Sequence, residues 1–232
     1  MRITYVTHTR FPTEKAHGFQ VASVCQALGR LGHTVTLLTP TVGNAIKENP
    51  LAYYSIQSSA FSFVNLPNFD ALSSQWVPGK LAFLVAMRSF RRALSAFLST
   101  HQTDLFYARS VQVLPPLLAT GIPTVLELHT LPRMARRTFL AQCRRCVVVL
   151  CLTQGIRDVL VSWGLDPKHV LVEGDAVDLM RFTRQKGAKP RWLLPQDRPV
   201  IGYVGSLVTG DALEKGVREF IDALALLRTR GR

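Results

Sequence analysis

The sequence has few acidic residues and no long apolar run. Its 15 Asp and Glu residues stand against 28 Lys and Arg residues, which gives a formal net charge of +13. Such a surface favours anionic partners, namely anionic lipid, a phosphate-bearing substrate or nucleic acid. No stretch approaches the roughly 20 apolar residues that span a bilayer, and the first residues enter a strand pattern without the features of a secretory signal. We therefore expect a cytoplasmic protein, with any membrane contact peripheral and at the inner face.

Cysteine is also scarce, with four residues in 232. Cys143 and Cys146 form a C-x-x-C pair and Cys151 follows, but no histidine lies at zinc-finger spacing from them. Residues 146–151 have the pattern of a buried strand, in which cysteine acts as a small hydrophobe. We expect the cysteines to be structural and the protein to need no metal.

The basic residues are not accompanied by a motif that reads nucleic acid, so we do not expect nucleic-acid binding. Residues 79–98 instead mix leucine and phenylalanine with Arg88, Arg91 and Arg92. An interfacial amphipathic helix on an anionic membrane has this composition. The alternative is that the apolar face is ordinary core and the arginines face water.

Short apolar runs alternate with longer amphipathic ones along the first 182 residues. This alternation predicts an α/β fold, a Rossmann-like open parallel sheet with helices on both faces. The predicted strands are residues 3–7, 34–38, 104–108, 124–128, 147–152 and 168–172, with 60–64 as a further candidate. The predicted helices are residues 19–31, 79–98, 111–119 and 136–145, and one that begins after a Thr153 cap and stops at Gly164.

A second domain is predicted near the end of the chain. Residues 183–198, rich in Lys, Arg, Gln and Pro, have the composition of a linker. Residues 200–207 then predict a strand, followed by a glycine turn, Lys215 and a helix to residue 232. One βα unit cannot bury both faces of a parallel sheet, so we expect an incomplete product or a partner subunit. The predicted domains are residues 1–182 and 199–232.

In such sheets, ligands bind beyond the carboxyl ends of the strands, and four segments follow strands in this way. The segment after the first strand contains Gly18, where the backbone can approach a ligand closely. His129 lies at the carboxyl end of the predicted strand 124–128, where it could hydrogen-bond a sugar or phosphate oxygen. The carboxylates at 173, 175 and 178 lack EF-hand spacing, which favours a turn. The segment from Gly205 to Gly216, with Lys215, leads into a helix N-terminus that favours phosphate. The dinucleotide motif G-x-G-x-x-G is absent.

Taken in order, these segments resemble the family 4 retaining glycosyltransferases, which have the GT-B fold of two facing Rossmann-like domains. The resemblance covers nearly the whole chain. Ala176 replaces the usual glycine of the family's Gly-Val-Asp motif, and three residues rather than two precede Phe182. The matching segments are Gly18, residues 27–38, residues 176–182, residues 202–205 and Lys215-Gly216.

The resemblance implies transfer of a sugar from a nucleotide-sugar to a glycan, lipid-linked or other acceptor, with retention and without an obligatory metal or other cofactor. It implies that Lys215 neutralises the diphosphate, that Gly18 lets the backbone approach the donor, and that His129 contacts the sugar. In the donor loop with Gly205, Ser206 stands where many members have arginine.

The family's paired-glutamate motif would lie beyond residue 232, so we expect this chain to be inactive alone. The alternative function is a non-catalytic domain that binds an acceptor, a membrane or a separate donor-binding subunit.

Overall fold

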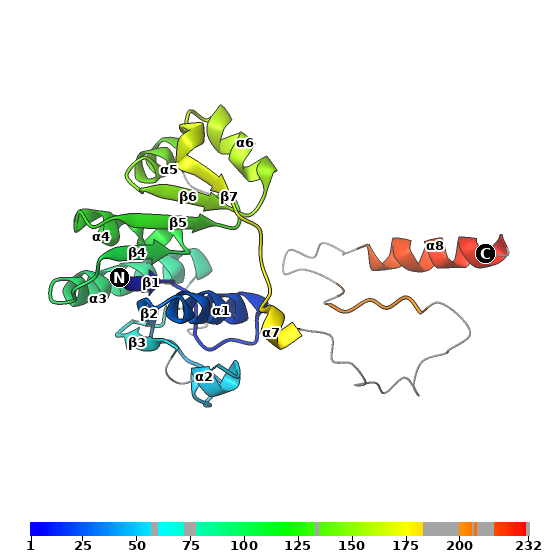
Figure 1. The fold of residues 1–232 in the computed structure, drawn as a ribbon, viewed down its shortest axis with the longest axis horizontal. Helices are drawn as coiled ribbons and strands as arrows, with labels where there is room; N and C mark the ends of the chain where they lie inside the picture. The colour runs from blue at the N-terminus through cyan, green and yellow to red at the C-terminus, as the bar shows by residue number, and fades with distance from the viewer. Residues whose placement is uncertain are drawn as a thin grey trace. The chain divides into compact units, whose positions relative to one another are not determined.

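The computed structural model describes residues 1–56, 60–71, 78–132, 135–182, 200–205, 207 and 216–230 (Figure 1). The chain divides into two compact units, Met1–Leu179 and Met180–Arg232. The predicted linker, residues 183–198, lies outside the described residues. None of the described helices is long and apolar enough to cross a membrane.

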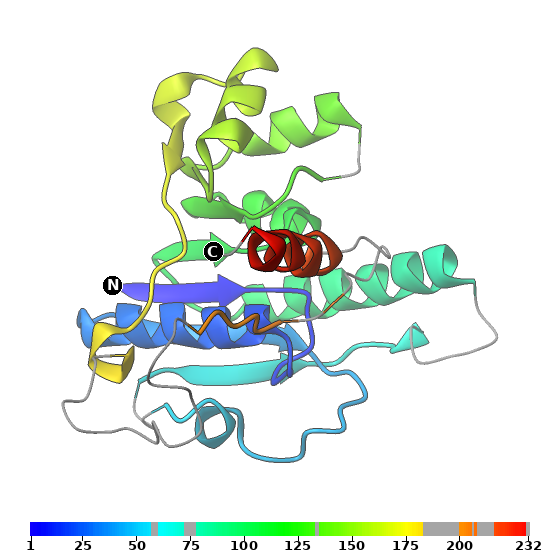
Figure 2. The same cartoon turned by 90° about the vertical axis from the view of Figure 1, so that its right-hand side faces the viewer.

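The first unit is built on a seven-stranded, fully parallel sheet with the order β3-β2-β1-β4-β5-β6-β7. Figures 1 and 2 show the strands side by side with helices around them. This confirms the predicted α/β, Rossmann-like class. The strands are β1 (Arg2–Val6), β2 (Thr34–Pro40), β3 (Ser62–Leu66), β4 (Leu105–Ala108), β5 (Thr124–Leu128), β6 (Val148–Cys151) and β7 (Val170–Val172).

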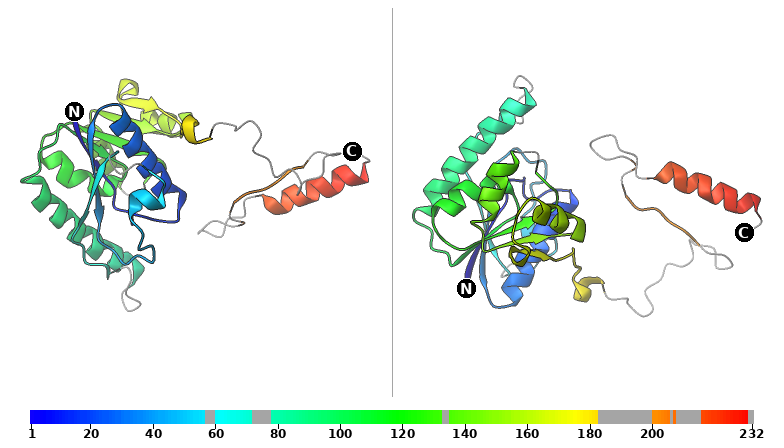
Figure 3. Two further views of the ribbon diagram at one scale, coloured as in Figure 1. Left: turned by 60° about the horizontal axis from the view of Figure 1, so that its bottom comes forward. Right: turned by 90° about the horizontal axis from the view of Figure 1, so that it is seen from above.

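The strand pleat divides the core into two clusters, because successive side chains point to opposite faces. Tyr5 and Leu37 lie in one cluster with Val21 of α1, whereas Val6 and Leu38 lie in the other. Figure 3 shows α1 and α3 on opposite sides of the sheet. The helices are α1 (Ala16–Arg30), α2 (Pro50–Tyr53), α3 (Gly79–Leu98), α4 (Leu114–Ala119), α5 (Arg136–Cys143), α6 (Gln154–Ser162), α7 (Leu179–Phe182) and α8 (Val217–Thr229).

The predicted elements of the first unit are confirmed, most of them with bounds that differ by a few residues, and 3₁₀ turns alter two of them. The predicted helix 111–119 divides into a 3₁₀ turn, Val111–Val113, and α4, because prolines are favoured in the first turn of a helix. The predicted strand 168–172 is shortened by a 3₁₀ turn, Pro167–His169, whose backbone is capped by Asp166. Thr153 caps α6 as predicted, accepting a hydrogen bond from the Ile156 N–H.

The four cysteines are free and buried, as predicted. Burial raises the pKa of Cys143 and of Cys146 to about 12, so neither thiol ionises near neutral pH. They pack in the main core cluster with Cys151. Their role in the described structure is that of small apolar side chains.

In the second unit, the predicted strand 200–207 is wrong for the residues that are described. Residues 200–205 have no regular secondary structure and are exposed. A strand needs a neighbour for its backbone N–H and C=O groups, and no other strand is present among the described residues of this unit. The following helix does form, as α8, and its Ile221, Leu226 and Leu227 side chains are exposed.

The packing of α1 depends on Gly29. A Cβ at this position would lie 2.0 Å from the backbone carbonyl oxygen of Ala60, at the entry to β3. We expect Gly29→Ala to lower the free energy of unfolding by about 1–3 kcal/mol, although alanine favours helix more than glycine. Urea unfolding followed by circular dichroism measures the change.

The matched control is Gly155→Ala in α6, where the nearest atom to the new Cβ is 4.0 Å away. This variant should be neutral or more stable by up to about 1 kcal/mol. Equal effects of the two substitutions would contradict the close approach at Gly29.

Candidate functional site

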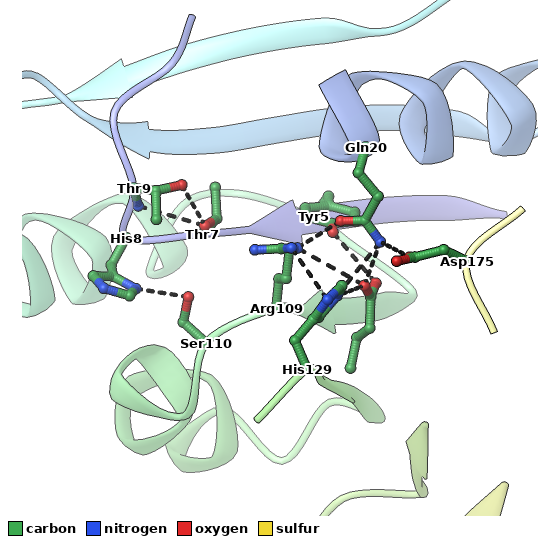
Figure 4. Close-up of polar contacts among 10 residues, drawn as sticks. Tyr5, Thr7, His8, Thr9, Gln20, Arg109, Ser110, His129 and Asp175 are labelled. Carbon is green, nitrogen blue, oxygen red and sulfur yellow. Dashed lines mark hydrogen bonds and ion pairs between the residues drawn. The ribbon is translucent and has the colours of Figure 1, made fainter. Parts of the chain in front are cut away.

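The strand order brings together residues that are far apart in the sequence. Val6 of β1 pairs with Ala108 of β4, and Ala108 pairs with Leu126 of β5. Since the strands are parallel, the segments that follow them meet at one edge of the sheet. Figure 4 shows Arg109, His129 and Gln20 pointing toward one another at this edge.

Glu127 is the buried centre of this group, with a side chain that is 6% exposed. Its carboxylate accepts hydrogen bonds from Gln20 Nε2 at 2.7 Å and from the Tyr5 hydroxyl at 3.4 Å, and it also bonds to His129 Nε2. Burial alone would raise the pKa of Glu127, but hydrogen bonds from His129, Gln20 and Tyr107 outweigh it and hold the pKa below its usual value. Glu127 is therefore a buried carboxylate at neutral pH.

Arg109, which directly follows β4, offsets the negative charge of Glu127. Its Nε atom is 3.8 Å from Glu127 Oε1 and donates to Gln20 Oε1 at 2.7 Å. One of its terminal nitrogens lies 3.3 Å from His129 Nδ1. Four side chains from α1, β5 and the ends of β4 and β5 thus form one closed network, named here the edge network: Gln20, Arg109, Glu127 and His129.

His129 lies in the edge network, at the carboxyl end of β5 as the sequence predicted. Its side chain is 21% exposed, more than Arg109 or Glu127. It is thus the member of these three that solvent or a ligand reaches most readily. This geometry fits hydrogen bonding to a ligand at the sheet edge.

The carboxylates after β7 attach the returning chain to α1. Asp175 accepts a hydrogen bond from Gln20 Nε2 at 3.3 Å, and Asp178 pairs with Arg30 at 2.8 Å. Within the described residues, no group of three or more His, Cys, Asp or Glu side chains is arranged to hold a metal ion. The segment after β7 therefore contacts the edge network through the hydrogen bond between Asp175 and Gln20.

His8 lies beside the edge network, with Nδ1 2.7 Å from Ser110 Oγ. Burial, and then the nearby His17 and Arg109, lowers the pKa of His8 to about 4. In the unfolded chain its pKa is near 6.5. Below that value the unfolded state binds more protons than the folded one, so stability is lost as the pH falls from about 6.5 to 4.

We expect His8→Asn to flatten this loss by up to about 3 kcal/mol, because asparagine keeps a polar partner for Ser110 but does not titrate. Urea unfolding at neutral and acidic pH measures it. His33→Asn, outside the network, should keep the wild-type pH dependence. Identical pH profiles for His8→Asn and wild type would contradict the buried neutral imidazole.

The other predicted site residues do not lie in the edge network or are not described by the structure. Gly18 lies in α1, where a Cβ would fall 2.2 Å from the Tyr54 hydroxyl and 2.5 Å from Thr13 Cγ2. This packing explains the glycine without a ligand. Gly205 lies in the second unit, and Ser206 and Lys215 lie outside the described residues.

Sequence reasoning missed Gln20, Arg109 and Glu127. A signal for Glu127 was present, since a carboxylate stood inside the otherwise apolar run Thr124–Leu128. Arg109 directly follows β4, but its partner strands are far away in the sequence. Gln20 gave no signal, because a polar residue on a helix is ordinary.

A pocket of about 350 Å³ lies beyond the ends of β2 and β3. Apolar side chains, including Phe11 and Phe63, line it together with Asn44, Lys47 and Asn65. Mixed lining of this kind suits a ligand with both apolar and polar groups. Its position places it at the carboxyl-end edge of the same sheet.

The model of the family described as Glycosyltransferase Family 4 matches residues 18–181. No curated protein matches the chain. Among solved structures, sucrose-phosphate synthase from Thermosynechococcus elongatus is similar, with a TM-score of 0.59 and 14% identity over 85% of this chain and 54% of that one. HepE from Anabaena, in complex with UDP and glucose, has a TM-score of 0.52 and 16% identity over 78% and 46%.

UGT2 from Phytolacca americana, in complex with UDP-2fluoro-glucose and pterostilbene, has a TM-score of 0.50 and 15% identity over 76% of this chain and 54% of that one. At these identities the likeness shows the fold. The chain spans about half the length of these structures.

Proposed function

Because the chain belongs to Glycosyltransferase Family 4, we propose that it is the acceptor-side part of an enzyme that transfers a sugar from a nucleotide-sugar with retention of the anomeric configuration. The observation that carries the proposal is the edge network. It lies where open parallel sheets bind ligands, and all four of its residues fall within the family match.

In this proposal His129 contacts the transferred sugar. Gly205, Ser206 and Lys215 belong to the donor side, where Lys215 would offset charge on the departing diphosphate. Gly18 lets the backbone approach the donor, in addition to its packing against Tyr54. Glu127 is engaged by hydrogen bonds from Gln20, His129 and tyrosine side chains, so we assign it no role as a nucleophile.

The ligands of the neighbouring structures support a choice of donors to test. HepE was crystallised with UDP and glucose, and UGT2 with UDP-2fluoro-glucose. Uridine diphosphate sugars, UDP-glucose first, are therefore the donors to test. For the acceptor we propose a glycan or lipid-linked molecule of cell-envelope polysaccharide synthesis, with the pocket beside Phe63 as its candidate site.

We also propose peripheral contact of the first unit with an anionic membrane at the inner face. Phe90 and Leu94 of α3 are buried in the core, so the ordinary-core interpretation holds for that face. The first turns of α3 differ, because Leu81, Leu84 and Val85 are exposed. Lys80 and Arg88 are exposed on the same stretch. Apolar side chains flanked by cations suit an anionic interface.

We expect Leu84→Glu to weaken binding to mixed phosphatidylcholine–phosphatidylglycerol vesicles by at least about tenfold, since it removes an inserted leucine and adds a repelled charge. Co-sedimentation measures the binding. Leu31→Glu makes the same charge change at an exposed leucine elsewhere and should bind like wild type. An equal loss of vesicle binding in both variants would contradict insertion of Leu84 and show that net charge alone drives the binding.

We further propose that residues 1–232 need a donor-binding domain for turnover. The test compares residues 1–232 alone with the protein supplied with such a domain, using UDP-sugars and an acceptor extract, and following release of nucleoside diphosphate. Release only in the second case, with the donor's anomeric configuration kept in the product, supports the proposal. Turnover by residues 1–232 alone would refute the requirement.

An outcome with no release in either case, but capture of acceptor or a donor-binding subunit, would favour the non-catalytic alternative. Salt-sensitive DNA binding without vesicle binding would favour the third function, nucleic-acid binding, which the sequence makes the weakest.

A further inference from the structure

Phe63 and Asn65 present an aromatic ring and an amide side by side in the pocket beyond the ends of β2 and β3. They are two residues apart on β3, so their side chains lie on the same face of the strand. Both line the pocket. Phe11 adds a second aromatic wall, with its ring centroid 6.3 Å from that of Phe63. The pocket therefore offers apolar surface next to a hydrogen-bonding group.

The amide of Asn65 is oriented by its neighbour in the sheet. Thr39 is the partner of Asn65 in the pairing of β2 with β3, and its hydroxyl donates to Asn65 Oδ1 at 2.6 Å. Thr39 is fully buried, which keeps water from competing for this bond. With Oδ1 engaged, the Nδ2 hydrogens are the part of the amide that a ligand can use, and they only donate hydrogen bonds. The pocket thus presents a donor beside the Phe63 ring.

A second asparagine shapes the wall of the pocket instead of binding a ligand. Asn44 Nδ2 donates to the carbonyl oxygen of Pro12 at 2.8 Å, and its Oδ1 accepts from the Ile46 N–H at 3.0 Å. The Gly43 N–H donates to the Asp70 carboxylate at 2.9 Å. These bonds hold the loop after β2 against the loop after β1. The pocket is therefore formed before a ligand enters, as most small-molecule sites are.

The charges that line the pocket cancel each other. Lys47 and Glu48 are the charged residues among its described lining, and both are exposed. Protein sites for phosphate combine several cationic or backbone donors. A carboxylate next to the lysine repels an anion. A neutral ligand suits this lining better than a phosphate does.

The surface proposed above for the membrane lies on the other face of the sheet. Phe11 belongs to the core cluster that contains Tyr5, and Phe63 packs against it, whereas the buried side of α3 belongs to the other cluster. Figure 3 accordingly shows α1 and α3 on opposite sides of the sheet. The sheet thus separates the exposed Leu81 and Leu84 of α3 from the pocket. A lipid chain at α3 and a polar ligand in the pocket occupy different places.

We propose that this pocket holds a neutral pyranose ring of the acceptor glycan, with the C–H face of the sugar against Phe63 and a sugar hydroxyl accepting from Asn65 Nδ2. The phosphate and the lipid of a lipid-linked acceptor then lie outside it. This inference rests on the proposed function, because it names the part of the acceptor that the pocket binds. The volume of about 350 Å³ is at the lower end of the roughly 300–1,000 Å³ of ligand pockets, which suits one or two sugar rings.

The experiment is saturation-transfer difference nuclear magnetic resonance of residues 1–232 with the methyl pyranosides of glucose, galactose and mannose, before and after inorganic phosphate is added. We expect saturation to reach the C–H protons of at least one pyranoside, and phosphate to leave this transfer unchanged. Phe63→Leu should weaken binding by about tenfold, since it removes the aromatic face but keeps an apolar side chain. Asn65→Ala should weaken it by about two- to tenfold, through loss of one hydrogen bond.

Phe69→Leu is the matched control, because it makes the same change at an exposed phenylalanine outside this pocket and should bind like wild type. Circular dichroism checks that each variant is folded. No transfer to any pyranoside, displacement by phosphate, or an equal loss in Phe69→Leu would overturn the proposal. A loss in His129→Ala instead of Phe63→Leu would place the pyranoside at the edge network and overturn it as well.

The binding test needs neither donor nor turnover. Pyranoside binding that depends on Phe63, in a protein that releases no nucleoside diphosphate even with a donor-binding domain, would support the pocket and refute the proposed function. Turnover without such binding would do the reverse. The two failures are therefore distinguishable.

Discussion

Arg109→Met is expected to lower the free energy of unfolding of the first unit by about 3–5 kcal/mol. The Arg109 and Glu127 side chains are only 13% and 6% exposed, so removing the cation leaves a buried carboxylate without its charged partner. Without Arg109, the pKa of Glu127 rises in the folded state. The destabilisation should therefore shrink as the pH is lowered, because the folded state then takes up the proton more readily. Urea unfolding of residues 1–232 at several pH values measures both effects.

Two further variants separate charge from packing. Arg109→Met with Glu127→Leu removes both partners and should recover much of the loss, since no buried charge then remains. Arg30→Met breaks the more exposed pair with Asp178, whose side chains are 49% and 20% exposed, and should cost no more than about 1 kcal/mol. A loss in Arg109→Met no larger than in Arg30→Met would show that the edge network does not hold a buried charge.

His129→Ala is expected to reduce kcat for sugar transfer by about 10²–10³-fold in the protein supplied with its donor-binding domain, if the hydrogen bond strengthens as charge develops on the sugar. The free energy of unfolding should change far less than in Arg109→Met, because Glu127 keeps Gln20 and Arg109. Steady-state release of nucleoside diphosphate measures the rate.

His33→Ala is the control for this loss. His33 precedes β2, at the opposite edge of the sheet from His129, and its removal should leave kcat unchanged. A His129→Ala protein with wild-type kcat would remove His129 from the reaction and leave the edge network with a structural role alone.

The fold was predictable because its signals are local. Gly79–Leu98 and Thr124–Leu128 have the predicted bounds, since an amphipathic period and a β-branched apolar run each determine one element. The strand at residues 200–207 failed for the opposite reason. Its apolar pattern is as strong, but a strand exists only where another strand pairs with it, and sequence pattern does not supply the neighbour.

The site was predictable only where it coincides with a strand end. His129 could be selected because it ends an apolar run, and that position is confirmed, whereas its role is a proposal. Arg109 and Gln20 could not be selected from the sequence, because β1, β4 and β5 become neighbours through a strand order that differs from chain order. A hydrogen-bond ring across 109 residues, from Gln20 to His129, has no local signature.

The measurement that tests the central claim most directly is a crystal structure of the protein with its nucleotide-sugar bound. The account predicts a sugar hydroxyl within about 3 Å of a ring nitrogen of His129, with Arg109 still bonded to Gln20. A sugar held elsewhere, with the contact between Arg109 and His129 intact, would contradict it.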